Sequence, residues 1–485
     1  MRLGELCRGW TEVDSKIDVT GLAVDSRNVA PGNLFAALSG SRTDGARYVQ
    51  DAIARGAVAV LAAPGAVPQD LPVPVLVDED PRRRLSLLAA RFHGAQPATV
   101  VAVTGTNGKT STVDFAAQIW TRLGLPAGSL GTLGVRAPGY AAKLAHTSPD
   151  PVTLHRHLAG VAAAGVDRLA IEASSHGLDQ RRLDGMRFSA AAFTNLTRDH
   201  LDYHGSFEAY VAAKRRLFDT LLPSGAGAVI NLDDPIGLDL AEIARRRGHR
   251  LYRLGRAGSE LKLLDTQAAD GRIRVAAELF GRRCELALNL IGDFQVMNVL
   301  TAYGLVVAAG ADARAAAAVL DALAGVPGRL QRAATHPSGA PIYVDYAHTP
   351  DALAKVLEAA RPHAARELVV VFGCGGDRDR GKRPEMGAVA AARADRIIVT
   401  DDNPRTEDPA SIRSAALARC PGALEIGDRA EAIRHAVAGL DTGDVLVIAG
   451  KGHEQGQIVG DQVLPFDDVT VAQAAVEALR WRNSA

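Results

Sequence analysis

One glycine-bearing loop constrains the fold of this chain more than any other segment: Thr104 to Thr110, T-G-T-N-G-K-T. A β-branched apolar run at 98–103 precedes it and a helical pattern begins at Thr110, so we predict a buried strand, a loop and a helix. Glycines allow backbone amides to approach phosphate oxygens, and the N-terminus of a helix adds positive potential. Such a unit indicates an α/β sheet that can bind a phosphate group at its edge.

The loop departs from the general phosphate-binding pattern. G-x-x-x-x-G-K-[ST] would require a glycine at Val103, so G-x-x-G-K-T is what remains. In that pattern Lys109 can reach the β- and γ-phosphates of a nucleotide, and Thr110 or Ser111 can reach Mg²⁺. A chance glycine turn is the alternative, and the strand-to-helix context argues against it. The predicted nucleotide contacts here are Gly105, Thr106, Asn107, Gly108, Lys109, Thr110 and Ser111.

The length of the chain and its charge limit the classes of protein to which it can belong. The chain has 485 residues, enough for about three domains. Lysine plus arginine equals aspartate plus glutamate at 55 each, which removes the attraction on which most nucleic-acid binding depends. The longest apolar stretch, 299–310, is too short to span a bilayer, and residues 1–10 lack the apolar core of a signal peptide. Four scattered cysteines fit a reducing compartment. We therefore expect a cytoplasmic protein that binds neither nucleic acid nor membrane.

Strand and loop signals divide the chain into three units. A first unit runs to Pro97, a second opens with the strand before the glycine loop, and the segment 326–329 is typical of a linker. Short apolar runs then alternate with helical patterns, at 342–344, 368–372, 397–400 and 445–449. This alternation predicts an α/β protein with a mostly parallel sheet in its third unit. In such sheets ligands bind beyond the carboxyl ends of the strands.

Two loops of the second unit carry groups that can bind a metal or titrate. Glu172 ends a strand-like run, where a buried carboxylate is costly unless it is paired or binds a metal. One or two such carboxylates beside a nucleotide suffice for Mg²⁺, although a helix cap is the alternative role. Between Asp199 and His204, two histidines and two aspartates lie within six residues. Lys214, in a helical segment, would by itself be taken for a surface lysine.

Polar loops follow four strand-like runs of the third unit, at 343–351, 373–384, 401–405 and 450–454. Arg378 and Arg405 in these loops suit a bidentate grip on a carboxylate or a phosphate. Any single loop could carry ordinary surface charges. Four together at strand ends indicate a binding site.

Taken in their order along the chain, the motifs described above and a few further stretches resemble the Mur ligase family, and the resemblance covers essentially the whole chain. The resemblance implies an N-terminal UDP-binding domain at 1–97, a central P-loop-type ATP-binding domain at 98–328 and a C-terminal Rossmann-like, amino-acid-binding domain at 329–485, in a monomer. The stretches that carry it are Asp25-Ser26-Arg27, 104–110, Thr147-Ser148-Pro149-Asp150, 172–178, 195–205, 345–350, 375–384, 402–405 and 450–454.

The resemblance also implies roles for individual residues. The uridine side would contact Ser26, Ser41, Arg42 and Thr43, and the muramoyl-dipeptide and pyrophosphate would contact Thr147, Ser148, Ser174, Gln180 and Arg182. Further ATP contacts would be Asn298, Arg329, Asp345 and His348. Two Mg²⁺ ions would be held with the help of Thr110, Glu172, His200 and Lys214, the last as N6-carboxylysine, a carbamate derived from CO₂. The expected catalytic residues are Lys109, Lys214, His200 and Glu172.

The loops of the third unit narrow the reaction that the resemblance implies. Members of the family with D-N-P-R at this point are associated with meso-2,6-diaminopimelate, which is added to UDP-N-acetylmuramoyl-L-alanyl-D-glutamate in cytoplasmic peptidoglycan precursor synthesis. ATP would convert the γ-carboxylate of D-glutamate to an acyl phosphate, which the amine attacks. The residues expected around diaminopimelate are Arg378, Asp402, Asn403, Pro404, Arg405, Gly450 and Glu454.

Three alternatives remain at this point. The same reaction could use L-lysine, although lysine-adding members depart from the arginine at position 405. A different Mur or folylpolyglutamate-type amide ligase is disfavoured by the D-N-P-R and G-K-G-H-E loops. A regulatory nucleotide switch would have no use for the acidic and histidine loops beside a dedicated third domain.

Overall fold

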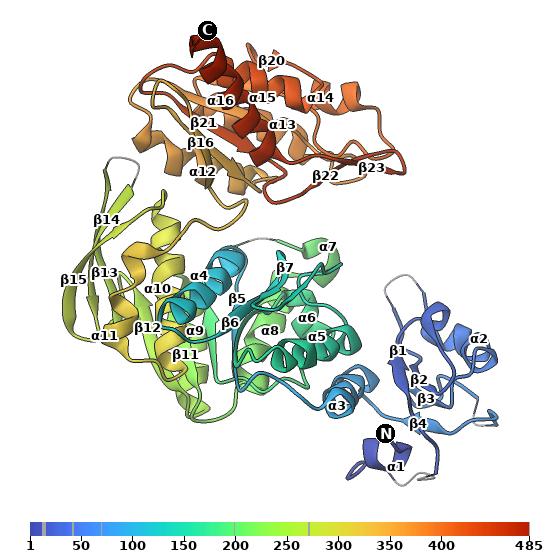
Figure 1. Ribbon diagram of the computed structural model, residues 1–485. Helices are drawn as coiled ribbons and strands as arrows, with labels where there is room; N and C mark the ends of the chain where they lie inside the picture. The colour runs from blue at the N-terminus through green and yellow to red at the C-terminus, as the bar shows by residue number, and fades with distance from the viewer. Residues whose placement is uncertain (12–15, 41–42, 69, 198, 270–271, 485) are drawn as a thin grey trace. The chain divides into compact units, whose positions relative to one another are not determined.

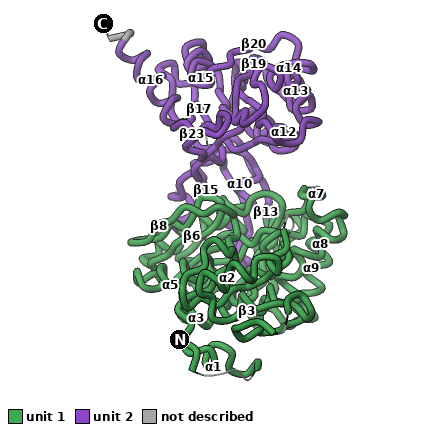
Figure 2. Tube along the Cα trace, turned by 90° about the vertical axis from the view of Figure 1, so that its right-hand side faces the viewer, with its two compact units in different colours: residues 1–262, 298–317 green, residues 263–297, 318–485 purple. Residues whose placement is uncertain are grey.

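The computed structural model describes every residue except 12–15, 41–42, 69, 198, 270–271 and 485. Ser41 and Arg42, both predicted on the uridine side, lie outside the described residues. Sheets flanked by helices recur along the chain (Figure 1), which confirms the predicted α/β class. The chain forms two compact units, one of residues 1–262 with 298–317 and one of residues 263–297 with 318–485 (Figure 2).

The N-terminal sheet has four parallel strands in the order β1-β2-β3-β4. Alternate strand residues face opposite sides of a sheet, and two apolar clusters follow from this. Leu34 and Ala36 pack in one cluster with α1 and α3, whereas Phe35 packs in the other with α2. The elements are α1 (Leu3–Leu6), β1 (Gly21–Ala23), η1 (Ser26–Asn28), β2 (Asn33–Ala36), η2 (Gly45–Tyr48), α2 (Val49–Ala54), β3 (Ala59–Ala62), β4 (Val75–Val77) and α3 (Pro81–His93).

The predicted strand before the glycine loop is β5, at the centre of the next sheet. Within the first unit the order is β12-β11-β10-β5-β9-β6-β7-β8, parallel except for the antiparallel pairs β6–β7 and β7–β8. The loop after β5 therefore opens between the ends of β10 and β9. The elements are β5 (Thr99–Thr104), α4 (Lys109–Arg122), β6 (Ala127–Gly131), β7 (Gly134–Ala137), β8 (Tyr140–Ala142), α5 (Pro151–Ala163), β9 (Arg168–Glu172), α6 (Ser175–Asp179), β10 (Ala190–Phe193), α7 (Leu201–His204), α8 (Phe207–Arg216), η3 (Leu217–Leu221), β11 (Gly227–Asn231), α9 (Pro235–Arg246) and β12 (Arg250–Gly255).

The middle of the chain adds a β-hairpin and an apolar helix. Strands β14 and β15 pair antiparallel. The helix α10 takes up most of the apolar stretch at 299–310, and no helix of the described residues is long and apolar enough to cross a membrane. The elements are β13 (Leu261–Ala269), β14 (Arg272–Leu279), β15 (Arg282–Leu288), α10 (Asp293–Ala308), α11 (Ala313–Ala317) and η4 (Leu320–Ala322).

The C-terminal sheet has the order β16-β17-β21-β18-β19-β20, with only β16 antiparallel to its neighbour. Helices α12, α13 and α14 share one apolar cluster with the sheet, and α15 and α16 share the cluster on its other face. This two-sided cover agrees with the predicted Rossmann-like unit. The elements are β16 (Gln331–Thr335), β17 (Pro341–Asp345), α12 (Pro350–Ala360), η5 (Arg361–His363), β18 (Leu368–Phe372), α13 (Lys382–Arg393), β19 (Arg396–Val399), α14 (Pro409–Leu417), β20 (Leu424–Glu425), α15 (Arg429–Ala438), β21 (Val445–Ala449), β22 (Gly456–Val459), β23 (Gln462–Pro465) and α16 (Asp468–Ser484).

In the part of the chain that the structure describes, five helices begin at a capping residue followed by proline. The caps are Asp80, Asp150, Asp234, Thr349 and Asp408, and each side chain accepts a backbone N–H from the first turn. Proline suits the first helical position because the N–H that it lacks would have no partner within the helix. Each cap stabilises its helix by about 1 kcal/mol. These pairs fix where α3, α5, α9, α12 and α14 begin.

Candidate active site

The glycine loop between β5 and α4 packs closely against two other segments. A Cβ at Gly105 would lie 1.9 Å from Thr194 Oγ1, and one at Gly108 would lie 2.3 Å from Asn298 Oδ1. Both glycines have positive φ, 148° and 87°. Neither position therefore accepts another residue without displacing its neighbour. The structure places Asn298, a predicted ATP contact, directly against this loop.

The end of β10 holds the loop in shape. Thr194 Oγ1 donates to Asn107 O at 2.6 Å, and Asn107 N donates to Asn195 Oδ1 at 3.0 Å. Lys109 Nζ donates to Gly105 O at 2.9 Å, so its ammonium lies at the loop, where phosphate oxygens would bind. Neither Thr194 nor Asn195 was predicted as a site residue, although both lie in the polar stretch that follows β10.

Glu172, at the end of β9, is buried with 2% exposure beside three threonines. Its Oε1 accepts from Thr110 Oγ1 at 3.0 Å and from Thr132 N at 2.7 Å, and Thr132 Oγ1 lies 3.1 Å from Thr147 Oγ1. Hard oxygen donors of this kind fit Mg²⁺, which completes its shell with water and substrate phosphates. No three histidine, cysteine or acidic side chains converge on one metal-binding point in the described ranges. Thr132 lies in no motif, and sequence reasoning missed it.

Ser148 connects Glu172 to the predicted substrate contacts. Ser148 Oγ donates to Glu172 O at 2.9 Å, and Ser174 Oγ donates to Ser148 Oγ at 3.0 Å. Arg182 donates to Ser148 O at 2.6 Å and to Gln180 Oε1 at 2.7 Å. The predicted substrate residues Ser148, Ser174, Gln180 and Arg182 therefore form one hydrogen-bonded group.

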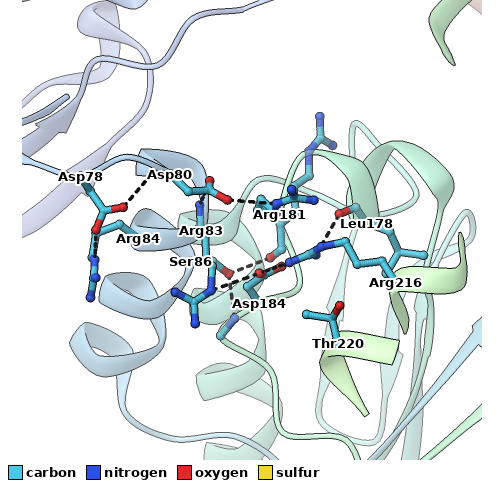
Figure 3. Close-up of polar contacts among 12 residues, drawn as sticks. Asp78, Asp80, Arg83, Arg84, Ser86, Leu178, Arg181, Asp184, Arg216 and Thr220 are labelled. Atoms are coloured by element: carbon cyan, nitrogen blue, oxygen red, sulfur yellow. Dashed lines mark hydrogen bonds and ion pairs between the residues drawn. The ribbon is translucent and has the colours of Figure 1, made fainter. Parts of the chain in front are cut away.

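The loop that carries Arg181 and Asp184 is anchored from α3 and from α8 (Figure 3). Ser86 Oγ donates to Arg182 O at 3.1 Å and accepts from Gly185 N at 2.9 Å. Asp184, whose side chain is 2% exposed, accepts from Arg216 Nη1 at 2.8 Å in a bidentate pair. Since Arg216 lies two residues after Lys214 on α8, this pair connects the helix of Lys214 to the loop of Arg182.

Replacement of Asp184 by asparagine is expected to lower the free energy of unfolding by about 2–3 kcal/mol, because the change removes a charge-assisted pair in a buried place. Urea unfolding measures the change. The matched control is Asp351→Asn, which removes an ion pair to Lys355 whose side chains are 58% and 42% exposed. Its expected effect is below about 0.5 kcal/mol. Equal effects of the two substitutions would contradict the anchoring role.

Lys214 is the largest departure from what the sequence alone suggests. The residue is 3% exposed, not a surface lysine, and its Nζ donates to Gly105 O at 2.7 Å. The ammonium also lies 4.6 Å from the centre of the Tyr210 ring. Burial, followed by the nearby charge of Lys109, lowers the pKa of Lys214 well below its ordinary value. Burial thus favours the neutral amine.

His200 lies in a different cluster from Glu172. Its φ is 52°, its Nε2 lies 3.4 Å from Asp199 Oδ2, and its ring centre lies 4.9 Å from that of His176. In the described chain His200 makes no hydrogen bond to Glu172. The structure therefore joins Thr110 to Glu172 and Lys214 to the glycine loop by hydrogen bonds, while the His200 ring lies 6.4 Å from the Tyr210 ring that the Lys214 ammonium also faces.

The predicted uridine contacts are only partly described. Ser26 is buried at the start of η1, and Thr43 O accepts from Gly40 N at 2.8 Å. A groove of about 270 Å³ is lined by residues 37–39, Ala63 and 79–82. Of these, residues 37–39 come shortly before Thr43 in the sequence.

The D-N-P-R loop after β19 and the G-K-G-H-E loop after β21 meet in the C-terminal part of the chain. A Cβ at Gly450, where φ is 114°, would lie 2.6 Å from Asp402 Oδ2, and Asn403 Nδ2 donates to Glu454 Oε2 at 2.9 Å. Asp402 and Asn403 are both buried. The structure therefore brings the loop that carries Asp402, after β19, against the loop that carries Glu454, after β21.

The two predicted arginines flank Gly375. A Cβ at Gly375 would lie 2.9 Å from Arg405 Nη1 and 3.8 Å from Arg378 Cγ. Arg405 Nη1 donates to Gly376 O at 2.8 Å, and a Cβ at Gly376 would lie 1.9 Å from Pro404 O. Two guanidinium groups and two carboxylates therefore belong to one cluster of loops. Such a set suits a ligand with both acidic and ammonium groups.

Three predicted ATP contacts gather around the end of β17. Asp345 is buried and accepts from Leu330 N and Ala347 N, each at 2.7 Å. Burial raises the pKa of Asp345 to about 6, against the lowering effect of Arg329. The Arg329 guanidinium lies 5.0 Å from the centre of the Tyr346 ring, and His348 Nδ1 lies 2.8 Å from Tyr346 O.

Comparison with known proteins identifies the family. Three family profiles match in succession: the Mur ligase family catalytic domain at 18–93, the Mur ligase middle domain at 103–306 and the Mur ligase glutamate ligase domain at 328–452. The chain belongs to the Mur ligase family. The resemblance read from the motifs is confirmed, and the protein is a ligase. Mur ligases use ATP with Mg²⁺.

Individual relatives of this Mur ligase carry one name. A protein of Bradyrhizobium diazoefficiens is 52% identical over 464 residues, with 95% of each chain covered, and one of Agrobacterium fabrum is 53% identical over 463 residues, with 96% and 94% covered. Both are named UDP-N-acetylmuramoyl-L-alanyl-D-glutamate–2,6-diaminopimelate ligase. A solved structure of a ligase of that name is 33% identical, covers 99% of both chains and has a TM-score of 0.73.

Proposed function

We propose that this Mur ligase joins meso-2,6-diaminopimelate to the D-glutamate γ-carboxylate of UDP-N-acetylmuramoyl-L-alanyl-D-glutamate, in cytoplasmic peptidoglycan precursor synthesis. The observation that carries the proposal is the loop cluster in which Arg378 and Arg405 accompany Asp402 and Glu454. Diaminopimelate has two carboxylates and two ammonium groups, whereas lysine has a single carboxylate and would leave one guanidinium without a partner. The names of relatives 52% and 53% identical support the same substrates.

The reaction balances without a covalent enzyme intermediate. ATP transfers its γ-phosphoryl group to the substrate carboxylate, which gives ADP and an acyl phosphate. The amine attacks the carbonyl carbon, and the tetrahedral intermediate loses a proton and expels inorganic phosphate. Lys109 and the backbone amides at the start of α4 stabilise negative charge on the transferring group. Mg²⁺, when bound, neutralises charge on the phosphate oxygens.

In this proposal Thr110, Glu172 and His200 hold Mg²⁺, and Lys214 carries a carbamate. CO₂ reacts with an unprotonated amine, and burial lowers the pKa of Lys214 toward that form. The carbamate would replace the buried amine with a carboxylate-like anion, which can take part in holding two Mg²⁺ ions. The hydrogen bond from Lys214 Nζ to Gly105 O brings this side chain to the glycine loop, where the phosphates of ATP would bind.

The remaining assignments complete the proposal. The domain division at 97/98 and 328/329 is supported by family matches that end at 93, begin at 103 and resume at 328. The N-terminal domain would bind the UDP end through Ser26 and residues 41–43, and the group around Arg182 would bind the muramoyl-dipeptide. The enzyme would act as a monomer on small-molecule substrates.

An amino-acid panel tests the proposal directly. Purified enzyme with ATP, Mg²⁺ and UDP-N-acetylmuramoyl-L-alanyl-D-glutamate is expected to release phosphate with meso-2,6-diaminopimelate at least about a hundredfold faster than with L-lysine, since lysine lacks the second carboxylate. Colorimetric phosphate release measures the rates. D-Alanyl-D-alanine and glutamate serve as controls for the other ligases of this fold. Faster release with lysine would overturn the substrate assignment.

A further inference from the structure

The G-K-G-H-E loop contains a buried lysine that has no part in the reaction described above. Lys451, in the loop after β21, is fully buried, with 0% exposure. A lysine ammonium is rarely buried without partners, because its removal from water is costly. The partners of Lys451 therefore indicate what it does.

Both hydrogen-bond partners of the Lys451 ammonium belong to the predicted amino-acid site. Lys451 Nζ donates to Asn403 Oδ1 at 2.9 Å and to Glu454 Oε2 at 3.2 Å. Asn403 Nδ2 donates to the same Glu454 oxygen at 2.9 Å, and Ile458 N donates to Asn403 Oδ1 at 2.9 Å. The Asn403 amide can adopt only one orientation, because its oxygen faces two donors and its nitrogen faces a carboxylate.

In this arrangement one carboxylate oxygen of Glu454 accepts hydrogen bonds from the protein and the other does not. Oε2 accepts from both Lys451 and Asn403, while Oε1 has no hydrogen-bond partner in the described parts of the chain. The Glu454 side chain is 33% exposed. Oε1 is therefore the acceptor that a ligand ammonium can reach, and its place depends on how Oε2 is held.

We propose that Lys451 is a positioning residue that determines the amino-acid specificity of the enzyme, by fixing Glu454 and Asn403 so that Oε1 of Glu454 receives the distal ammonium of a diamino diacid. The inference rests on the proposed function, in which Glu454 belongs to the site for diaminopimelate. Lys451 itself does not touch the substrate. The ammonium also balances the carboxylates that the two loops bring together.

The same region offers a matched control for the loss of a buried cation. Arg429 and Asp468 form a fully buried pair, in which Arg429 Nη2 lies 2.7 Å from Asp468 Oδ2. Arg429 Nη2 also donates to Ala449 O at 2.9 Å, at the end of β21. In the described residues Arg429 makes no hydrogen bond to Glu454. Arg429→Met therefore removes a buried cation without breaking the contacts of Lys451.

The experiment is a double-mutant cycle on the full-length enzyme. KM for meso-2,6-diaminopimelate, KM for ATP, kcat and the unfolding midpoint are measured for the wild type, Lys451→Met, Glu454→Gln and the double variant. Lys451→Met is expected to raise KM for diaminopimelate about tenfold or more, with KM for ATP within about twofold. In the Glu454→Gln background the same change is expected to raise it less than about twofold, because Lys451 acts through Glu454. Lys451→Arg, which keeps the charge, is expected to recover part of the loss.

Other results would overturn the inference. The inference fails if Lys451→Met leaves KM for diaminopimelate unchanged, or if it raises KM for diaminopimelate and KM for ATP equally. It also fails if the two single increases in KM for diaminopimelate multiply fully in the double variant. Arg429→Met is expected to lower the unfolding midpoint and to show weaker coupling to Glu454→Gln than Lys451→Met does, because Glu454 acts on Arg429 through charge and not through a hydrogen bond; coupling as strong as that of Lys451→Met would reduce the role of Lys451 to general stability. A wild type without diaminopimelate-dependent phosphate release overturns the proposed function itself. Normal release with unresponsive variants overturns only the role of Lys451.

Discussion

Replacement of Lys214 by alanine is expected to lower kcat by about 10²–10³-fold, the loss typical of removing one preorganised electrostatic group from an active site. Lys214 is buried on α8 and donates to Gly105 O in the glycine loop at 2.7 Å. In the proposed function its carbamate helps to hold Mg²⁺ beside the phosphates. Steady-state phosphate release with saturating substrates measures the loss.

Chemical rescue distinguishes the carbamate from a simple packing role. Formate or acetate is expected to restore part of the activity of Lys214→Ala, because a small carboxylate can occupy the space left by the side chain and supply the missing oxygens. The control is Arg215→Ala on the same helix, where the side chain is 53% exposed and pairs with Asp219. Its activity is expected to stay within about twofold of the wild type, because exposed pairs contribute little. Full activity of Lys214→Ala would refute the assignment.

The elements that carry the site could be predicted because their signals are local. The apolar run predicted as a strand at 98–103 corresponds to β5 (Thr99–Thr104) in the structure. The runs at 368–372 and 445–449 correspond to β18 and β21, with the same bounds. Each was followed by the polar loop that sequence periodicity placed at a strand end. Parallel strands of one sheet present such loops at the same edge, so the loops after β18 and β21 both lie at one edge of the C-terminal sheet.

The partners of those loops could not be predicted, because they depend on tertiary structure. Thr132 and Thr194 lie outside the phosphate motif, and only the alignment of β6, β9 and β10 with β5 brings them to Glu172 and the glycine loop. Lys451 was visible in the sequence as part of a loop, yet its burial and its two acceptors follow from the meeting of the β19 and β21 ends. A lysine in a helix, such as Lys214, has no sequence signal for burial.

The position of His200 shows the limit of assignment by motif. The stretch 195–205 predicted a metal ligand, whereas the described contacts of His200 are with Asp199, His176 and Tyr210. A motif fixes the order of residues, while the distance between two side chains depends on loop conformation, here on a backbone with φ of 52°. The role of His200 as a metal ligand stays a proposal.

Replacement of Arg405 by alanine is expected to raise KM for meso-2,6-diaminopimelate about a hundredfold and to leave KM for ATP within about twofold, because a bidentate, charge-assisted contact with a carboxylate is lost. Alanine keeps a Cβ, so the cost of φ at 52° is unchanged by the substitution. Phosphate-release kinetics with each substrate varied in turn measure both constants. The control, Arg393→Ala, removes a pair to Glu358 at 2.9 Å on α13 and is expected to change neither constant.

Arg405→Lys separates charge from geometry at the same position. A lysine ammonium keeps the positive charge but offers no planar fork, so its KM for diaminopimelate is expected between those of the wild type and Arg405→Ala. Arg405 Nη1 also donates to Gly376 O at 2.8 Å, so some loss of loop order accompanies either change. Loss of loop order alone would lower kcat and raise both KM values together. A selective rise for diaminopimelate would instead identify Arg405 as the group that recognises a carboxylate of the incoming amino acid.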